Sequence, residues 1–447
     1  MKIRKDKILD YLCMVFAFAL ICMDFFGCLL QADSLLIIVS FIPIMVLAGI
    51  IFFNDTGFIT IDQMLGVYLF MFCYYTPIHQ YTAHTNIHRF SQLTGIDYLY
   101  ANLVILLFEL TYLFGRKYNR EKKSKEGIFK DVKLGTFSLF LLMVLGVGCL
   151  VWLQGKHVLF STGESTFADS SVGTVILKII RFVPVSTLLI YIFARRDKMI
   201  SGNKKVNDAI SIVIFLIFLV VFFPLNGVIS RYLLFGTYLM VLHTIFENGK
   251  KRSLIIAAAF IGFYLIFPAF NFFKFHNLRE ISQFRLGGFD ATFIDYDAYE
   301  MLICSIHYVS EHGVLFGLNI LTAILCIVPR SIWTGKLNPT GAIIAESNNA
   351  AFLNLSCPIY AEFYMAFGIF GVICCTIVFS RFVNFLEDKL NTKNIFWRSM
   401  YSIAVGMIIP FSRGAMLPMM SFWISLIIAL MICCLVCSFT EKRVGTR

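Results

Sequence analysis

The chain has 447 residues, of which 59% are hydrophobic and 15% are charged, and its formal net charge is +11. Soluble domains have about 25% charged residues, so this composition excludes an ordinary soluble protein and indicates a membrane protein. Basic residues in a membrane protein mostly set its topology, so the positive charge does not predict a nucleic-acid partner.

Apolar runs that are long enough to cross a bilayer recur along the whole chain. The hydrocarbon core is about 30 Å thick and needs about 20 residues of helix. We therefore predict an all-α polytopic protein with about twelve transmembrane helices. Residues 1–270 are predicted to form the first nine, at about 8–30, 35–53, 63–81, 96–114, 134–153, 174–194, 209–223, 228–246 and 254–272.

One long segment, 271–357, precedes the last three predicted helices, which lie in 358–447 at about 358–380, 395–411 and 416–437. Basic residues gather at both termini and in alternate loops, which predicts cytoplasmic termini and an outer location for 271–357. Within it, 313–328 is apolar but short for a span, and we interpret it as a re-entrant or interfacial helix. The amphipathic stretch 297–312 is predicted to lie along the membrane surface.

A set of basic residues is not explained by the positive-inside rule, because its members fall on the outer side. They are Arg89, Lys156, Lys178, Arg181, Arg231, Lys274, Arg279, Arg285, Arg330, Lys336 and Arg413. Arginine near lipid must pair with an acid, reach the interface or bind an anion. Taken singly, each arginine is more simply structural. Taken together, they predict an outer anion site, since guanidinium matches two phosphate oxygens at once.

Glu362 is the main acidic candidate, just past the first turn of the helix predicted to follow Pro358. The simpler interpretation is a carboxylate favoured by the positive end of its helix dipole. The alternative is a general base acting on an attacking hydroxyl. The sequence leaves both open.

Two further groups have the spacing of metal ligands. Asp295 and Asp297 form a DxD pattern, and His79, His84 and His88 crowd one outer loop. Such pairs of acids occur often by chance, and a zinc site would need a further ligand beside the histidines. We predict no metal and no cofactor. The chain also has no nucleotide-binding fingerprint, so an activated substrate would have to carry its own energy.

The polar stretch around 327–371 has the order of residues seen in a known family. Pro329-Arg330-Ser331-Ile332-Trp333, Lys336 and Pro339 are followed by Tyr360, Glu362 and Phe367-Gly368. This order resembles the bacterial oligosaccharide repeat-unit polymerases of the Wzy type, which make O-antigen and capsule. Asp290 and the pair Arg413-Gly414 are also similar to that group. The resemblance covers mainly 289–371.

The resemblance implies a GT-C-like membrane glycosyltransferase in the bacterial cytoplasmic (inner) membrane. Such an enzyme transfers glycan from undecaprenyl diphosphate to an acceptor repeat unit on the outer face, and a chain-length regulator is a conceivable partner. Arg231, Arg330, Lys336 and Arg413 would contact the diphosphate or glycan phosphate. Arg181, Asp290 and Tyr360 would complete the substrate site, and Glu362 would act as base or position the acceptor.

Two other functions remain open at this point. An O-antigen ligase shares the architecture, and only the Trp-Lys-Pro region favours a polymerase. A flippase for lipid-linked oligosaccharide would need charges along a central path between two similar halves, and the sequence shows no such halves. A purely structural membrane scaffold would leave the outer basic residues unexplained.

Overall fold

The computed structural model describes residues 19–53, 59–88, 90, 92–116, 140–141, 143–148, 171–197, 199–200, 204–223, 230–246, 262, 290–390 and 394–444. The regular elements in these ranges are helices. Six of them are long and apolar enough to cross a membrane. The prediction of a helical membrane protein is thus confirmed. The count of about twelve stays a prediction, because most of 254–272 and parts of 8–30 and 134–153 lie outside the described residues.

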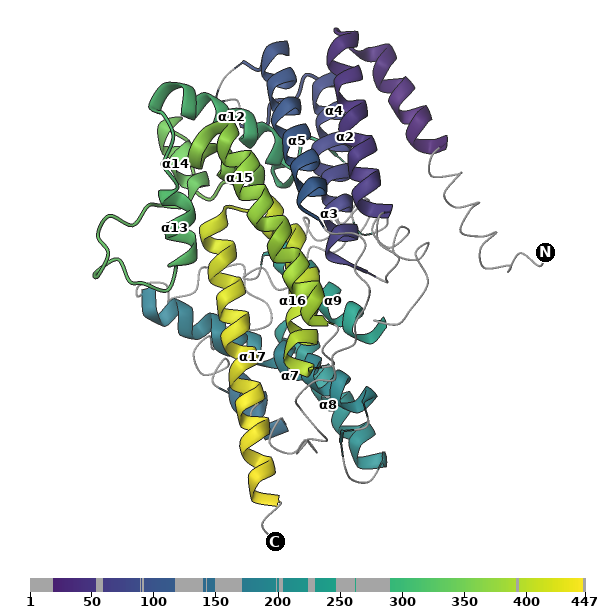
Figure 1. Cartoon of the computed structure of the whole chain (residues 1–447), viewed down its shortest axis with the longest axis vertical. Helices are drawn as coiled ribbons and strands as arrows, with labels where there is room; N and C mark the ends of the chain where they lie inside the picture. The colour runs from purple at the N-terminus through teal and green to yellow at the C-terminus, as the bar shows by residue number, and fades with distance from the viewer. Residues whose placement is uncertain are drawn as a thin grey trace, which may run out of the picture.

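The described N-terminal helices form one group, at the upper right of Figure 1. It comprises the helix Ala19–Gln31, α2 (Leu35–Phe53), α3 (Ile61–Leu69), the π-helical turn η1 (Phe70–Tyr75), α4 (Thr76–Thr82) and α5 (Gly95–Gly115). A capping box begins α3, in which Gln63 N donates to Thr60 Oγ1 at 3.2 Å and Thr60 N to Gln63 Oε1 at 3.1 Å. This box satisfies two N–H groups that the first turn would leave unpaired.

The second group is built around α16 (Ile395–Arg413), whose residues from Arg398 to Ser412 are buried. Around it lie α7 (Ser171–Arg196), α8 (Lys204–Val221), α9 (Arg231–Phe246), α15 (Ile359–Leu390) and α17 (Met416–Val444). The α9 and α16 backbones touch through two glycines, since a Cβ on Gly236 would lie 2.5 Å from the Gly406 oxygen. Small residues allow this close approach between membrane helices.

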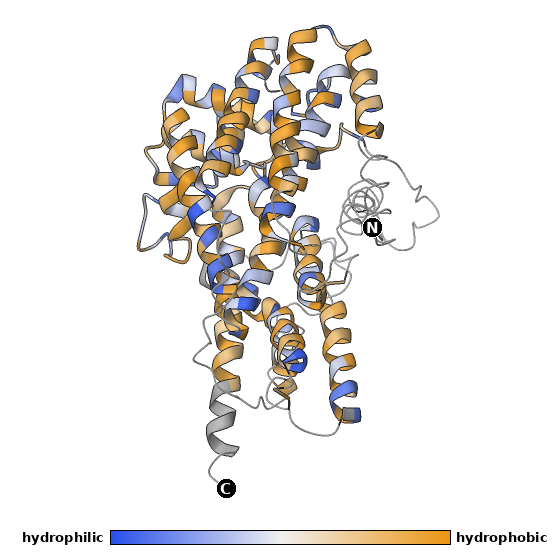
Figure 2. Ribbon diagram, turned by 45° about the vertical axis from the view of Figure 1, so that its right-hand side comes forward, coloured by the Kyte–Doolittle hydropathy of each residue, from blue (hydrophilic) through white to orange (hydrophobic). Residues whose placement is uncertain are grey.

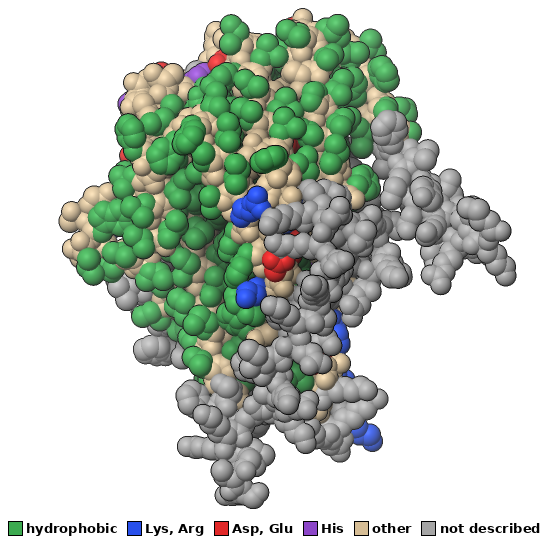
Figure 3. All heavy atoms as spheres, viewed as in Figure 1, with side chains coloured by type: hydrophobic (Ala, Val, Ile, Leu, Met, Phe, Trp, Pro, Cys, Tyr) green, Lys and Arg blue, Asp and Glu red, His purple; other side chains and the backbone are tan. Residues whose placement is uncertain are grey.

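Apolar side chains cover much of the surface that faces lipid in such a protein. Where Figure 3 colours the side chains by type, most of them are hydrophobic, and Figure 2 shows apolar residues along the outside of both helix groups. Exposed examples include Leu35, Phe114 and Val378. A soluble protein rarely exposes apolar area of this extent, whereas a membrane-embedded helix must.

The segment predicted to lie on the outer side contains, in its described part, η5 (Ile294–Tyr296), α12 (Ala298–His312), α13 (Leu318–Ile324) and α14 (Thr340–Ser347). The seven residues of α13 span about 10 Å, too little to cross a bilayer, in keeping with a re-entrant or interfacial segment. Residues Ala298 to Ser305 of α12 are buried, because α12 packs on α15, α5 and α14. This half of the predicted amphipathic stretch is thus covered by protein, and the surface position of 297–312 stays a prediction.

A bend in α15 receives the chain between α12 and α13. Phe367 and Gly368 leave the helical conformation, and Gly368 has φ +63°, which favours glycine. Two carbonyls beside the bend accept bonds from the chain ahead of α13. Leu315 N donates to Met365 O at 2.8 Å, and Gly317 N donates to Ala366 O at 3.2 Å. The bend therefore positions α13 against α15.

Candidate functional site

The carboxylate of Glu362 lies where three other elements meet, and the residue is 1% exposed. Its Oε1 accepts the backbone N–H of Met416 at 2.6 Å and the hydroxyl of Thr340. Its Oε2 accepts the Asn319 amide at 2.9 Å. Met416 is the first residue of α17, so the helix dipoles of both α15 and α17 favour the negative charge of this carboxylate. Glu362 thus holds α13, α14 and α17 together.

Lys336 and Arg330 fold the loop after α13 back on itself. The Lys336 amine donates to the carbonyls of Cys326 at 2.7 Å and Val328 at 2.9 Å, just past the end of α13. The Arg330 guanidinium donates to Lys336 O at 2.7 Å and to Asn338 Oδ1 at 2.9 Å. Burial lowers the pKa of Lys336, and the neighbouring Arg330 charge adds to this effect.

Two more cations, Lys178 and Arg181 of α7, lie near the loop after α13. The Lys178 amine donates to Ser421 Oγ of α17 at 2.9 Å and lies 4.5 Å from the centre of the Phe422 ring. The charge of Arg181, one turn further along α7, acts on Lys178. The charges of Lys178 and Lys336 both act on the Cys326 thiol. We name Lys178, Arg181, Arg330 and Lys336 the α13 cation group.

The α13 cation group has no acidic partner among the described residues. No carboxylate oxygen in this part of the chain forms a salt bridge with any of its four members. Lys336 is buried, Lys178 and Arg181 are half-buried and Arg330 is exposed, so water screens these like charges only in part, and a bound anion would relieve their repulsion. The group is therefore suited to an anionic ligand.

Glu362 and the α13 cation group lie at the two ends of one short helix. Asn319, near the start of α13, touches Glu362, and Cys326, just past its end, touches Lys336. The first turns of α17 make the same connection through Met416 and Ser421. The carboxylate and the Lys336 amine are consequently separated by about the length of α13, roughly 10 Å.

Arg231 and Arg413 belong to a second charged group. Arg231 Nη1 donates to Asp295 Oδ2 at 2.9 Å, and Arg413 Nη2 donates to Asp297 Oδ1 at 2.8 Å. His88 Nε2 lies 3.2 Å from the other Asp297 oxygen. Burial opposes ionisation of Asp297, but the Arg413 charge and the His88 contact hold its pKa below the usual range. The DxD acids thus bind different arginines rather than one metal.

The structure divides the site residues predicted from the sequence. Arg181, Arg330 and Lys336 share one group, while Arg231 and Arg413 are already paired with acids. Asp290 is exposed and accepts the backbone N–H of Thr292 at 2.9 Å. The buried Tyr360 hydroxyl lies 3.4 Å from that of Tyr68, away from the Glu362 carboxylate's partners. Arg89, Lys156, Lys274, Arg279 and Arg285 lie outside the described residues.

Asn319 and Thr340 are not identified by the sequence alone, although one signal is present. Asn319 is a polar amide within the apolar run 313–328, and such a residue usually has a specific partner near lipid. Lys178 belongs to the basic residues that topology leaves unexplained, but only the structure places it in the site.

Helices and charged groups together define a helical membrane protein with a buried polar site between its helices. Neither a family of proteins, nor a curated protein, nor a solved structure matches the chain.

Proposed function

We propose that this protein is a membrane glycosyltransferase that polymerises lipid-linked oligosaccharide repeat units. It would transfer glycan from undecaprenyl diphosphate to an acceptor repeat unit on the outer face of the bacterial cytoplasmic membrane. The observation that carries the proposal is the α13 cation group, which has no acidic partner among the described residues and lies one short helix away from the buried carboxylate of Glu362.

In this proposal the α13 cation group binds the diphosphate of the donor. The acceptor hydroxyl attacks the anomeric carbon, a new C–O bond forms, and the bond from that carbon to the diphosphate oxygen breaks. The diphosphate leaves with the electron pair, and fixed positive charges stabilise it without reorganisation of solvent. Arg330 and Arg181 supply guanidinium forks, which fit phosphate oxygens better than an amine does.

Glu362 receives the proton of the acceptor hydroxyl in the same step. A general base must lie within hydrogen-bond reach of that proton. The Thr340 hydroxyl already donates to Oε1 of Glu362, so an acceptor hydroxyl that displaced it would meet the carboxylate in the same way. Arg231 and Arg413 take a positioning role, because their pairs with Asp295 and Asp297 fix the outer segment against α9 and α16.

The first test is the surface polysaccharide of a strain that lacks this protein, resolved as a gel ladder. A collapse to core that carries a single repeat unit supports the polymerase. Core without any repeat, with lipid-linked polymer accumulating, indicates a ligase. Lipid-linked single units retained on the cytoplasmic side indicate a flippase.

The second test asks whether the α13 cation group is responsible. Complementation with Arg181→Gln or Lys178→Met is expected to shorten or abolish the ladder, with normal amounts of protein in the membrane. Arg381→Gln is the matched control, because Arg381 is exposed on α15 and outside the group. A full ladder from the Arg181 and Lys178 variants would refute the assignment.

A further inference from the structure

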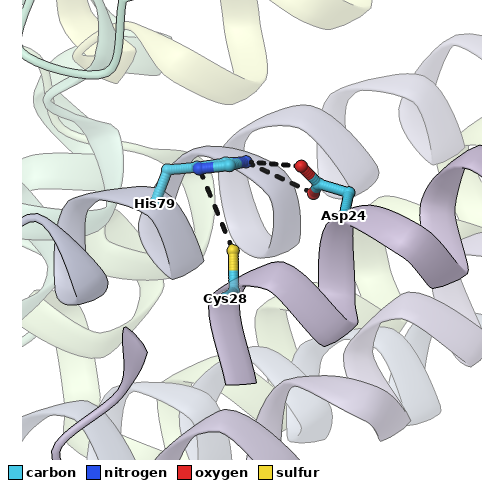
Figure 4. A group of neighbouring side chains, drawn as sticks. All are labelled: Asp24, Cys28 and His79. Atoms are coloured by element: carbon cyan, nitrogen blue, oxygen red, sulfur yellow. Dashed lines mark hydrogen bonds and ion pairs between the residues drawn. The ribbon is translucent and has the colours of Figure 1, made fainter. Parts of the chain in front are cut away.

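Three donor side chains meet at the N-terminal edge of the fold, away from the site described above. Asp24 and Cys28 come from the helix Ala19–Gln31, and His79 comes from α4 (Figure 4). Asp24 and Cys28 are four residues apart, so both point to the same face of their helix. One ligand atom from each of the three residues lies within 4.8 Å of the other two.

The structure assigns to Asp24, Cys28 and His79 a binding site for a divalent cation of the zinc type. Thiolate, imidazole and carboxylate are the three protein ligands of zinc, and sulfur and nitrogen together favour zinc over magnesium or calcium. The inference does not depend on the proposed glycosyltransferase activity.

The three side chains lie close together, with Cys28 and Asp24 on different nitrogens of the His79 ring, of which one ion would bind one. Cys28 Sγ lies 3.9 Å from His79 Nδ1, and His79 Nε2 lies 3.2 Å from Asp24 Oδ1. Ligand atoms at tetrahedral angles around zinc are about 3.3–3.6 Å apart, given bonds of about 2.0–2.3 Å. In Figure 4 the two imidazole nitrogens face different partners. A small turn of the ring directs one nitrogen to an ion between Cys28 and Asp24.

One side of the proposed metal site is buried, and the other side is accessible to solvent. Cys28 is 4% exposed, whereas the side chains of His79 and Asp24 are each 29% exposed. An ion can enter from the side of His79 and Asp24 and keep a water molecule as its fourth ligand. Three protein ligands with one open position form a regular coordination for zinc.

Tyr74 is a separate observation that points to a ligand here. The residue is fully buried, and its hydroxyl has no hydrogen-bond partner among the described residues. The Asp24 carboxylate acts electrostatically on this hydroxyl, so the hydroxyl lies in the same region as the three donor side chains. A buried hydroxyl without a partner is costly, and water bound to the ion would satisfy it.

The local backbone is also unusual. Tyr74 and Tyr75 lie in the π-helical turn η1 directly before α4, and π-helical turns occur frequently at functional sites. The Tyr75 ring packs edge-on against the His79 imidazole with ring centres 4.7 Å apart, which holds the imidazole in place. The ion would join the helix Ala19–Gln31 to α4.

The test measures metal binding by the full chain purified in detergent. Protein freed of metal and titrated with ZnCl2 is expected to bind about one zinc per chain, measured by elemental analysis after gel filtration. Cys28→Ser, His79→Gln and Asp24→Asn are each expected to weaken binding by about tenfold or more. Cys22→Ser and His84→Gln are the matched controls, one on the same helix and one in the adjoining turn, and should bind as the native protein does.

A second measurement distinguishes loss of a metal ligand from loss of folding in the variants. Titration with Co2+ should give a thiolate-to-cobalt charge-transfer band that Cys28→His loses while it still binds one ion. Three outcomes overturn the inference: the native protein binds no zinc at micromolar concentration, or binding survives all three ligand substitutions as an adventitious ion only, or the control substitutions abolish it equally.

Discussion

The carboxylate of Glu362 accepts the first backbone N–H of α17, that of Met416, at 2.6 Å. One acidic side chain near the start of a membrane helix therefore also caps the start of another. The same carboxylate accepts bonds from α13 and α14, so it combines a structural role with the role of base proposed for it. The two roles can be separated by substitution.

Glu362→Ala should remove both roles, and Glu362→Asp should keep the charge while shortening its reach. Three donors left unpaired in a buried place would lower the free energy of unfolding by about 3 kcal/mol or more. Thr340→Val removes one donor only and should lower stability by about 1 kcal/mol. Thermal unfolding in detergent checks this order. Equal melting temperatures for Glu362→Ala and the native protein would contradict the contacts described.

The polymer ladder checks the proposed catalytic role separately. Thr340→Val should leave a substantial ladder, since the carboxylate remains, whereas Glu362→Gln should abolish it while the protein stays in the membrane. A normal ladder from Glu362→Gln would exclude Glu362 as the base.

Lys336 makes the proposed diphosphate binding sensitive to alkaline pH. Its pKa is lowered by burial and by Arg330, so it loses its charge at a lower pH than an exposed lysine does. Polymer formation in vitro should therefore fall on the alkaline side, and Lys336→Arg should move that fall to higher pH. The pH dependence of folding stability has the opposite direction. The unfolded chain binds the proton more tightly, so the free energy of unfolding rises with pH until about 10.4. An unchanged alkaline limb in Lys336→Arg would contradict the assignment.

Asp297→Asn should be more destabilising than Asp295→Asn. The Asp297 side chain is 2% exposed and that of Asp295 is 15% exposed, and Asp297 also contacts His88 and accepts the Ser356 hydroxyl, so its removal disturbs more buried contacts. Breaking a buried pair costs about 3–5 kcal/mol. The pKa of Asp297 is lowered, so its contribution is present above about pH 4 and is lost as pH falls through the lower value of the folded state. Melting temperatures of both variants from neutral to acid pH measure these effects.

Gly368→Ala tests the bend in α15. A side chain at φ +63° costs about 1–2 kcal/mol, and straightening the helix would displace the chain ahead of α13. We expect a lower melting temperature and a shorter ladder. Gly49→Ala is the control, because Gly49 lies in helix α2 and an added Cβ there would meet open space. It should be neutral or slightly stabilising, and an equal loss in both variants would exclude the bend as the cause.

Much of the helical architecture could be predicted from the sequence, and the pairing of charges could not. The predicted helix 35–53 matches α2, and 96–114 matches α5 within a residue at each end, because long apolar runs are dictated by the bilayer. The division of the arginines depends on which acids the fold brings near. Asp295 and Asp297 are two residues apart in the chain, yet each pairs with an arginine from a different helix.

The same limit applies to His79. The sequence places it beside His84 and His88, but the structure separates all three, with His84 near Asp33 and His88 bound to Asp297. The partners of His79 come from a helix about fifty residues earlier in the chain. Spacing along the chain reports neighbours on one helix, and it does not report contacts between helices.

The bend at Gly368 also links two parts of the molecule that would otherwise be independent. The carbonyls of Met365 and Ala366 accept bonds from Leu315 and Gly317, outside their own helix. If α15 straightened, those carbonyls would turn back to the N–H groups of the next helical turn. The chain ahead of α13 would then be released from α15, and α13, whose Asn319 donates to Glu362, could shift with it. A change in curvature of one transmembrane helix would thereby change the surroundings of the buried Glu362 carboxylate.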